Sequence, residues 1–414
     1  MSLAGIEVAH RAAEAVARQS YGKLVAFLAA RNQDVASAED ALAEAFAAAL
    51  AQWPISGTPD NPEGWLLTVA RRKMIDTARG QKRGVAAGPH MQLLSEDLAA
   101  AAENQAQIPD SRLALMFACA HPAIDAAIRA PLILQTVLGF DAAAIGSAFL
   151  VSPAAMGQRL VRAKTKIKLA GIAFRVPEQD DLAGRLEAVL DAIYAAFAEG
   201  WSDPEGTQTQ RRNLAEEAIW LGQLVAALMP GEPEALGLSA LMLHAEARRA
   251  ARRDAAGEYV PLSEQDPALW NGAMIEAAEV LLFRASRAGR IGRFQLEAAV
   301  QSAHAARRVS GQTNWAAIET LYDGLLTLNG SPVVALNRAV AVGQSRGAAA
   351  GLAAMPEADA ALEQYQPYWA ARARLLAAAG QPGEASVAYH QAIGLESDPA
   401  VRRFLQRKRQ ALHL

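Results

Sequence analysis

Alanine dominates this chain, and runs of β-branched residues are scarce along it. Alanine has the highest intrinsic helix propensity, whereas Val, Ile and Thr favour strands. A chain with this bias is expected to form helices almost throughout. Because 414 residues exceed what one simple helical core accommodates, we expect two or three domains. The sequence therefore predicts an all-α protein built from several helical domains.

The composition places the chain among globular proteins with ample apolar mass to bury, since 52% of its residues are hydrophobic and 20% are charged. No apolar stretch approaches the roughly 20 residues that a membrane span requires. The N-terminus lacks a basic segment followed by an apolar one, the pattern of a secretion signal. Cys119 is the sole cysteine, which excludes an internal disulfide and fits a reducing compartment. We expect a cytoplasmic protein without membrane contact.

Charge is unevenly distributed along the chain. Residues 1–175 carry 18 basic and 15 acidic side chains, a formal net charge of +3. The remaining residues carry 22 basic and 28 acidic side chains, a net charge of −6. A mildly basic front half joined to an acidic back half is compatible with a nucleic-acid partner for the front half.

Breaks in helical periodicity divide the chain. Residues 5–83 are predicted to form the first helical domain, and residues 84–110, rich in Gly, Pro and Ala, a linker. Residues 111–175 form a second helical unit, followed by a short acidic joint containing Pro177. Residues 182–414 then form a long helical domain.

The sequence predicts a repeat in the C-terminal region. Residues 368–399 hold two helix patterns around the turn "GQPGEA", with Ala385, Tyr389, Ala392 and Pro399 at tetratricopeptide-like positions. Residues 331–355 look like a weaker preceding copy. Such hairpins stack on their neighbours and present a concave surface. A generic stack of helical hairpins without a partner is the alternative.

In residues 141–168, capping and turn residues predict two helices separated by a tight turn. Asp141 is placed to cap the first helix, and Ser152 to cap the second. Pro153 follows at the first helical position, where its missing N–H has no consequence. The second helix is expected to run to about Lys168.

This second helix has two chemically different sides. At 100° per residue, one side is apolar and predicts a core contact (Met156, Leu160, Ala163, Ile167). Basic residues flank that stripe, and no acidic residue interrupts them (Arg159, Arg162, Lys164, Lys166, Lys168). A buried seam with a basic outer face is the layout of a DNA recognition helix, with Gln158 and Arg162 as candidate base readers. An ordinary solvated helix face is the alternative.

The N-terminal region holds two further amphipathic helices. Residues 34–53 place Ala38, Leu42, Phe46 and Ala49 on one face and gather acidic residues in the first half. That acidic half would suit a basic partner surface or simply complement the helix dipole.

A Pro- and Gly-containing loop, residues 54–65, leads from Trp53 to Trp65 and the next helix. In that helix Leu67, Met74 and Ala78 are expected to face inward, and the opposite side carries Trp65, Val69, Arg72, Asp76 and Arg79. Aromatic and basic groups on one exposed face suit single-stranded DNA, because bases stack on rings while cations follow the backbone. Packing of the two Trp side chains against the loop is the alternative.

Taken in order, these segments resemble a bacterial RNA polymerase sigma factor of the extracytoplasmic-function group. The strings that carry the resemblance are "AEDALAEAF", "DNPEGWLLTVARRKMID" and "GFDAAAIGSAFLVSPAAMGQRLVRAKTKI". The first two resemble sigma region 2, and the third resembles sigma region 4. Downstream, "LGLSALMLHAEARRAAR" and "SPVVALNRAVAV" resemble the subgroup with a C-terminal tetratricopeptide-like domain.

The resemblance implies partners and roles. Core RNA polymerase is expected to bind Asp40, Glu44 and Phe46. Residues 55–61 and the following helix are expected to capture and open the minus-ten element, and the helix from Pro153 the minus-thirty-five element. The implied DNA-binding residues are Asn61, Trp65, Arg72, Arg79, Lys82 and Arg83 in region 2, and Ala154, Ala155, Gln158, Arg159, Arg162, Lys164 and Lys166 in region 4. The C-terminal domain is implied to tune activity, through an intramolecular contact or another protein.

The sequence departs from the family pattern at a few of these positions. Ala43 stands where Gln is usual, and Pro153 and Ala155 replace the more usual Glu and Thr that open the recognition helix. Thr77 and Ala78 alter the common ending of the region 2 helix. The recognition helix therefore lacks side chains that usually read base edges in this family.

Other classes of function fit the sequence less well. Cys119 and His121 are isolated metal donors, phosphate-binding glycine motifs are absent, and His244 and His304 sit on Ala-rich helices. We therefore expect no catalytic residues, no bound metal and no cofactor. The main alternative is a helix–turn–helix regulator, or a repeat-domain scaffold, that does not engage polymerase.

Overall fold

The computed structural model places most of the chain. It describes residues 10–14, 16, 20–21, 24–25, 28, 35–59, 61–82, 111–170, 177–201 and 209–413. Only the backbone is described at residues 35–36, 76–82, 111, 168, 170, 209–213, 360–361 and 413. The linker predicted at 84–110 lies outside the described residues.

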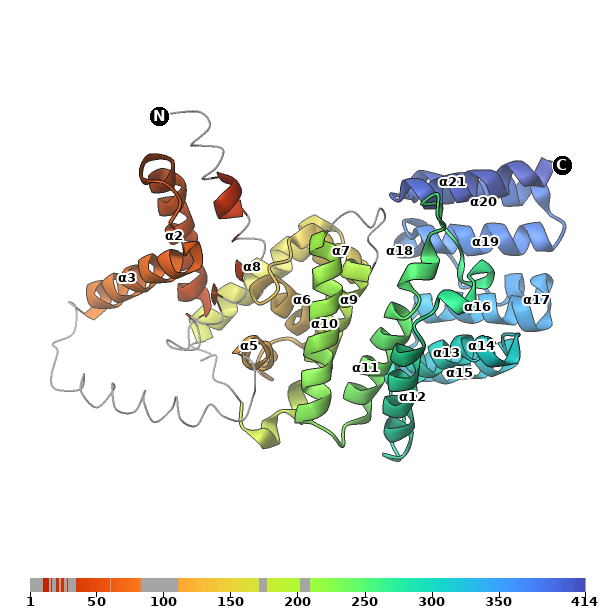
Figure 1. Cartoon of the computed structure of the whole chain (residues 1–414), viewed down its shortest axis with the longest axis horizontal. Helices are drawn as coiled ribbons and strands as arrows, with labels where there is room; N and C mark the ends of the chain where they lie inside the picture. Colours follow the sequence, from red (N-terminus) through yellow and green to blue (C-terminus); the bar gives the residue numbers. More distant parts are fainter. Residues whose placement is uncertain are drawn as a thin grey trace. The chain divides into compact units, whose positions relative to one another are not determined.

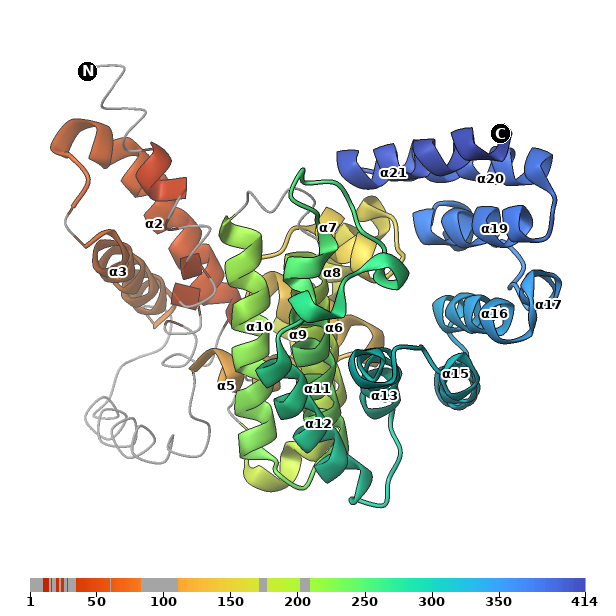
Figure 2. The ribbon, with the colours of Figure 1, turned by 45° about the vertical axis from the view of Figure 1, so that its right-hand side comes forward.

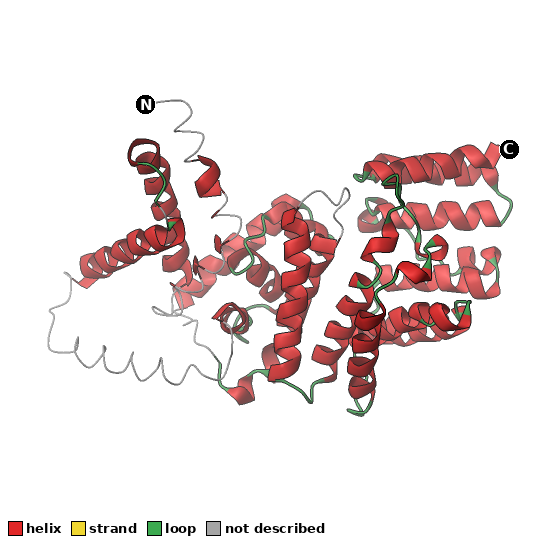
Figure 3. Ribbon diagram, in the orientation of Figure 1, coloured by secondary structure: helices red, strands yellow, loops and turns green. Residues whose placement is uncertain are grey.

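The described residues are helical, which confirms the predicted all-α fold (Figure 3). Their one β-type pairing is an isolated bridge between Arg253 and Tyr259. None of the described helices combines the length and apolarity needed to cross a bilayer. The chain divides into two compact units, residues 1–192 and 193–414. The helix α9 (Leu186–Trp201) passes from one unit into the other.

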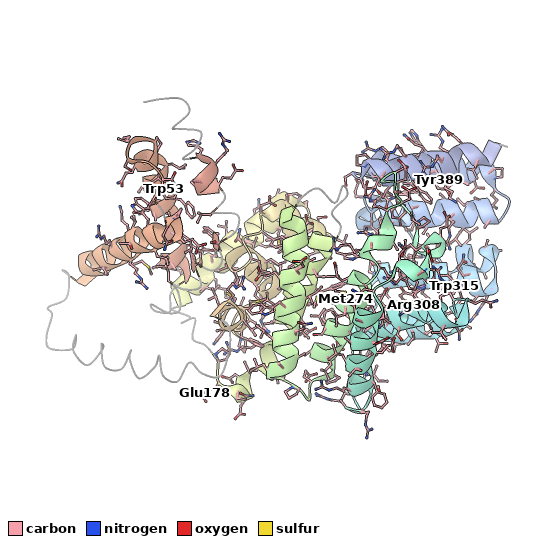
Figure 4. All side chains as sticks on the ribbon, viewed as in Figure 1. Trp53, Glu178, Met274, Arg308, Trp315 and Tyr389 are labelled. Carbon is pink, nitrogen blue, oxygen red and sulfur yellow. The ribbon has the colours of Figure 1, made fainter. Side chains whose placement is uncertain are left out.

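In the first unit, the described helical residues between 10 and 28 precede the helix pair α2 (Val35–Ser56) and α3 (Pro62–Lys82) (Figure 1). The predicted inner face of α2 is buried at Ala38, Leu42 and Ala49, whereas Phe46 is half-buried. Trp53 near the end of α2 is also buried (Figure 4). The buried alanines allow close packing, and Leu42 and Trp53 supply the larger side chains of this core.

Two predictions for this pair were wrong. The inward stripe of α3 is Leu66, Ala70 and Met74, which confirms Met74 but places Leu66 inward in place of the half-buried Leu67. The side chain of Ala78, also expected to face inward, lies outside the described atoms. The loop is also shorter than 54–65, because α2 continues through Pro54 to Ser56 and α3 starts at Pro62. Gly57 then ends α2 with a φ of 85°, a left-handed conformation that glycine adopts without strain.

The rest of the first unit contains α5 (Ser111–Cys119), α6 (Ala126–Thr136), α7 (Ala142–Ala148) and α8 (Pro153–Ala170). The short helices η2 (Gln179–Asp181) and η3 (Ala183–Arg185) precede α9. Large side chains from successive helices fill the core, among them Phe117, Ile133, Ile145 and Met156.

The buried Arg185 ties the η2–η3 segment to α5. Its Nη1 donates to the Phe117 carbonyl at 3.2 Å, and its Nη2 lies 3.9 Å from Asp181. Desolvation lowers the pKa of this guanidinium, while Asp181 partly offsets the effect. The segment after the predicted joint therefore contributes to the first unit.

The second unit is a succession of helices joined by short connections (Figure 2). They are α10 (Thr209–Leu228), α11 (Pro233–Glu246), η4 (Arg249–Arg252), η5 (Leu262–Glu264), η6 (Pro267–Leu269), α12 (Gly272–Ser286), α13 (Arg293–Ala305), α14 (Arg307–Ser310), α15 (Trp315–Asn329), α16 (Pro332–Arg346), α17 (Ala348–Ala353), α18 (Ala360–Glu363), α19 (Gln366–Ala378), α20 (Pro382–Leu395), α21 (Pro399–Gln410) and η7 (Ala411–His413).

Close packing fixes α11 against α13. A Cβ on Gly237 would lie 2.6 Å from the backbone nitrogen of Gln295, so only glycine fits at this crossing. The Glu234 carboxylate accepts hydrogen bonds from the N–H groups of Phe294 and Gln295, at 2.9 and 3.0 Å. These are N–H groups of the first turn of α13, which have no partner within the helix.

The pair α19–α20 matches the two helix patterns expected at 368–399. Gly380, with a φ of 74°, lies in the turn between them. Ala385, Tyr389 and Ala392 are buried in a core that also includes Leu405 of α21. In the preceding segment, 331–355, the second helix is only the short α17.

Candidate nucleic-acid interface

A sharp turn joins α7 to α8. The Asp141 carboxylate accepts hydrogen bonds from the N–H groups of Ala143 and Ala144, at 3.0 and 2.8 Å, which confirms the expected cap. Leu150 adopts a φ of 54° in the turn. Gly146 leaves room for the returning chain, because a Cβ there would meet the Val151 carbonyl oxygen at 2.5 Å.

The start of α8 has the predicted N-cap and first-position proline. The Ser152 hydroxyl accepts a hydrogen bond from the N–H of Ala155 at 3.4 Å, and Pro153 is the first residue of the helix. The predicted core stripe is buried at Met156, Leu160 and Ile167. These contacts orient the opposite side of α8 outward.

Most of the residues proposed to bind DNA in this segment lie on the outward side. Arg162 donates through Nε to the Gln158 carbonyl at 3.2 Å, so part of its side chain lies along the helix. Ala155 is only partly exposed. The exposed members of the set are Ala154, Gln158, Arg159, Arg162 and Lys166.

Lys164 differs from its neighbours because it faces α2. Its Nζ lies 2.7 Å from Glu39 Oε2, and the two side chains are 29% and 14% exposed. In this arrangement the Lys164 ammonium is neutralised by a carboxylate and does not stand free for a phosphate. No sequence pattern predicts this ion pair, because the two residues are far apart in the chain.

A shallow hollow lies on the outward side of α8. Pro153, Ala154, Gly157 and Val161 line it, together with Gln158 and Arg162. Val161 is 66% exposed although it is apolar. Gly157 and Val161, which the sequence pattern does not single out, place a bare backbone and an apolar side chain on this face. Such a face can approach base edges and thymine methyl groups closely.

In the α2–α3 pair, the predicted DNA-binding residues occupy different environments. The rings of Trp53 and Trp65 pack edge to face with centroids 5.5 Å apart, and Trp65 is half-buried. Asn61 is exposed, and its Oδ1 accepts a hydrogen bond from the Gly64 N–H at 2.9 Å. Asn61 thus caps α3, a structural role that the pattern Asn-Pro-Glu-Gly already allows.

The basic residues of α3 are described to different extents. Arg72 is exposed on the helix. Arg79 and Lys82 belong to α3, but their side chains are outside the described atoms. Arg83 lies outside the described residues.

The residues expected to bind polymerase share α2. Asp40 is exposed, and Glu44 pairs with Lys73 of α3 at 2.9 Å, with both side chains at least half exposed. The Phe46 ring stacks on Tyr21 with centroids 6.4 Å apart. Burial raises the pKa of Tyr21 to about 12, and Glu39 and Asp40 add to the rise. The partly or fully exposed surface of α2 therefore combines two carboxylates with the stacked rings of Phe46 and Tyr21.

The isolated metal donors do not assemble. Cys119 is buried, and desolvation, followed by Glu39, raises the pKa of its thiol. His121 Nδ1 accepts a hydrogen bond from the Ala123 N–H at 3.1 Å. Within the described part of the chain, no group of His, Cys, Asp and Glu side chains has a metal-binding arrangement.

Comparison with known proteins agrees with this organisation. Residues 16–84, which include α2 and α3, match the Sigma-70 region 2 family, and residues 185–286 match a family of unknown function (DUF6596). An uncharacterized protein of Rhizobium meliloti (strain 1021) is 39% identical over 393 residues, which cover 94% of this chain and 92% of the relative. No solved structure matches. The chain therefore belongs to the same full-length family as the Rhizobium protein, and its residues 16–84 form a segment similar to Sigma-70 region 2.

Proposed function

We propose that this chain is a promoter-specificity subunit of the extracytoplasmic-function group, which binds core RNA polymerase and directs transcription initiation. The observation that carries the proposal is the combination of a region 2 match over residues 16–84 with the outward basic side of α8. In this proposal α7, the turn and α8 form the helix–turn–helix of region 4. No catalytic residue and no cofactor enters the mechanism.

The proposed division of labour follows from the two surfaces. The outer face of α8 reads the minus-thirty-five element in the major groove, with Arg159, Arg162 and Lys166 holding phosphates and Gln158 facing base edges. Region 2 captures unstacked bases of the minus-ten element through Trp65 and Arg72, and the proposed set also includes Asn61, Arg79, Lys82 and Arg83. Base stacking contributes about 1–3 kcal/mol per base, which would offset part of the free energy needed to open the duplex.

The polymerase contact is proposed on α2. Asp40 and Glu44 offer carboxylates to a basic partner surface, and the half-buried Phe46 adds an apolar group beside them. Glu44 forms an exposed ion pair with Lys73, and exposed pairs of this kind contribute only about 0–1 kcal/mol. The pair can therefore exchange for a contact with polymerase at little cost.

The second unit is proposed as a tetratricopeptide-like regulatory domain in the cytoplasm. Its support is the succession of helical hairpins ending in α19–α20, with small residues and Tyr389 in the contact. An acidic domain of this kind would act on the basic front half or on another protein.

Binding of purified chain to core RNA polymerase tests this proposal. We expect a stable complex, and we expect the double variant Asp40→Ala, Glu44→Ala to weaken it. The matched control is Glu187→Ala at the start of α9, away from α2. Retention of promoter DNA binding without any binding to polymerase would favour a helix–turn–helix regulator instead.

A further inference from the structure

A strap in the second unit, residues 253–264, holds the C-terminal helix α21. Glu258 accepts hydrogen bonds from Arg403 and Arg407, each at 2.7 Å, and Glu264 pairs with Lys408 at 3.2 Å. The hydrogen bonds from Arg407 and Arg403 lower the pKa of the Glu258 carboxyl. Figures 1 and 2 show the loop between α11 and α12 reaching α21.

A cavity of about 420 Å³ lies beneath this strap. The strap forms one wall, and α16, α19, α20 and α21 form the others. Its volume is within the range of about 300–1,000 Å³ that small-molecule sites occupy. The cavity is large enough for a ring-sized molecule and too small for a folded partner.

Aromatic side chains supply much of the cavity wall. The rings of Tyr259 on the strap and Phe404 on α21 pack edge to face with centroids 5.4 Å apart. The buried Tyr389, labelled in Figure 4, adds a third ring from α20. Aromatic walls of this kind cover the apolar body of a ligand.

One positive charge at the cavity has no counter-charge. Arg374 of α19 lines it, and within the described part of the chain no carboxylate pairs with this guanidinium, whose ionisable neighbour is Tyr389. Desolvation lowers the pKa of Arg374, although part of the side chain remains exposed, and Tyr389 partly offsets that effect. The other cation of the wall, Lys408, is already paired with Glu264.

We propose that this cavity binds a small organic anion, a single carboxylate on an apolar, ring-sized body. The carboxylate pairs with Arg374, whose planar guanidinium matches it with two parallel hydrogen bonds. The apolar body lies in the cavity against the three rings. A dianion fits less well, because the site offers one uncompensated positive charge and Glu264 lies in the same wall.

Such a ligand would join two parts of the second unit. The strap belongs to residues 185–286, the segment that matches the family of unknown function, whereas the other walls belong to the C-terminal hairpins. A bound anion touches both and favours the arrangement in which the strap lies on α21. A ligand that binds only when the strap lies on α21 stabilises that arrangement by mass action.

Calorimetric titration of the full chain tests the proposal without polymerase or promoter, so its outcome is independent of the transcription function. The probes are benzoate, indole-3-acetate and 4-phenylbutyrate, each compared with its neutral amide. A peptide ending in Ala-Trp, with a free or an amidated C-terminus, distinguishes a protein terminus from a free metabolite as the source. We expect carboxylates to bind roughly tenfold or more tightly than their amides, the difference expected for a charged hydrogen bond.

Variants assign the binding to this cavity. Arg374→Met is expected to abolish the preference for carboxylates, and Ala370→Leu, which fills the cavity, to abolish binding of every probe. The matched control Arg372→Met changes a cation of the same helix that does not line the cavity. Binding of no probe, equal affinities for acid and amide, or unchanged binding to Arg374→Met would each overturn the proposal.

Discussion

Gly146 is the residue on which the turn between α7 and α8 depends. Since a Cβ would meet the Val151 carbonyl oxygen at 2.5 Å, Gly146→Ala forces the turn apart. We expect the free energy of unfolding to fall by about 1–3 kcal/mol, as for other overpacked sites. Urea denaturation of the chain measures this loss.

Gly157→Ala is the matched control on α8. An added Cβ there meets only Ala142 at 3.8 Å, an ordinary contact. Exchange of glycine for alanine within a helix is expected to stabilise it by up to about 1 kcal/mol. Equal losses in both variants would show that the turn does not need its glycine.

The cations of α8 are expected to differ in their effect on duplex binding. Arg162 and Lys166 are exposed, whereas Lys164 is paired with Glu39. We expect Arg162→Ala and Lys166→Ala each to reduce the slope of log affinity against log salt by about 0.9, the change for one lost phosphate contact. Lys164→Ala is expected to leave the slope nearly unchanged. A slope that falls equally in all three variants would contradict the distinction.

At the scale of elements, two histidines at helix contacts of the second unit remain neutral at neutral pH. His244 of α11 faces Glu279 of α12, with 3.4 Å between Nε2 and Oε1, and the His304 ring of α13 packs edge to face on Trp315 of α15. Burial lowers the pKa of His244 to about 4, with a contribution from Arg248. Burial also lowers the pKa of His304 to about 4, with Arg248 and Arg307 adding to the effect. Arg248 is itself buried and donates to Gln301 Oε1 at 2.6 Å.

These histidines predict a loss of stability in mild acid. Both folded-state pKa values lie below the ordinary 6.5, so the unfolded chain binds protons first as the pH falls. The free energy of unfolding is therefore expected to decrease from pH 6.5 towards pH 4, by at most about 1.4 kcal/mol per pH unit for each histidine.

Thermal melting between pH 7 and 5 measures this dependence. His244→Phe removes one of the two groups and is expected to reduce the change in melting temperature. The exposed His390 on α20 supplies the control, His390→Phe. An identical pH dependence in the wild type and His244→Phe would contradict the assignment.

Patterns within single helices predict local structure well in this protein. Asp141, Ser152 and the stripe of α8 follow directly from capping chemistry and the helical period. In α3 the buried Met74 was predicted, but Leu67 was expected inward in place of Leu66, because the two leucines are equivalent by composition and only packing selects Leu66. The Lys164–Glu39 pair and the cavity at Arg374 also depend on contacts between distant segments. Periodicity within one helix carries no information about such contacts.

At the scale of the whole molecule, the first unit extends beyond the predicted joint. Residues 182–190 bury Leu182, Leu186 and Val189, and Arg185 bonds to the Phe117 carbonyl. A chain ending at residue 175 is therefore expected to melt at a lower temperature than one ending at residue 192. Circular dichroism of the two truncated chains measures the difference, and equal melting temperatures would show that residues 176–192 are dispensable.

We propose above all that this chain directs core RNA polymerase to specific promoters. The most direct test is run-off transcription with purified core polymerase on duplex templates selected for binding to the complex. We predict transcripts from one start site that require the chain and weaken when Trp65→Ala and Arg72→Ala are combined. Absence of chain-dependent, promoter-specific transcripts from templates that the complex binds would contradict the account.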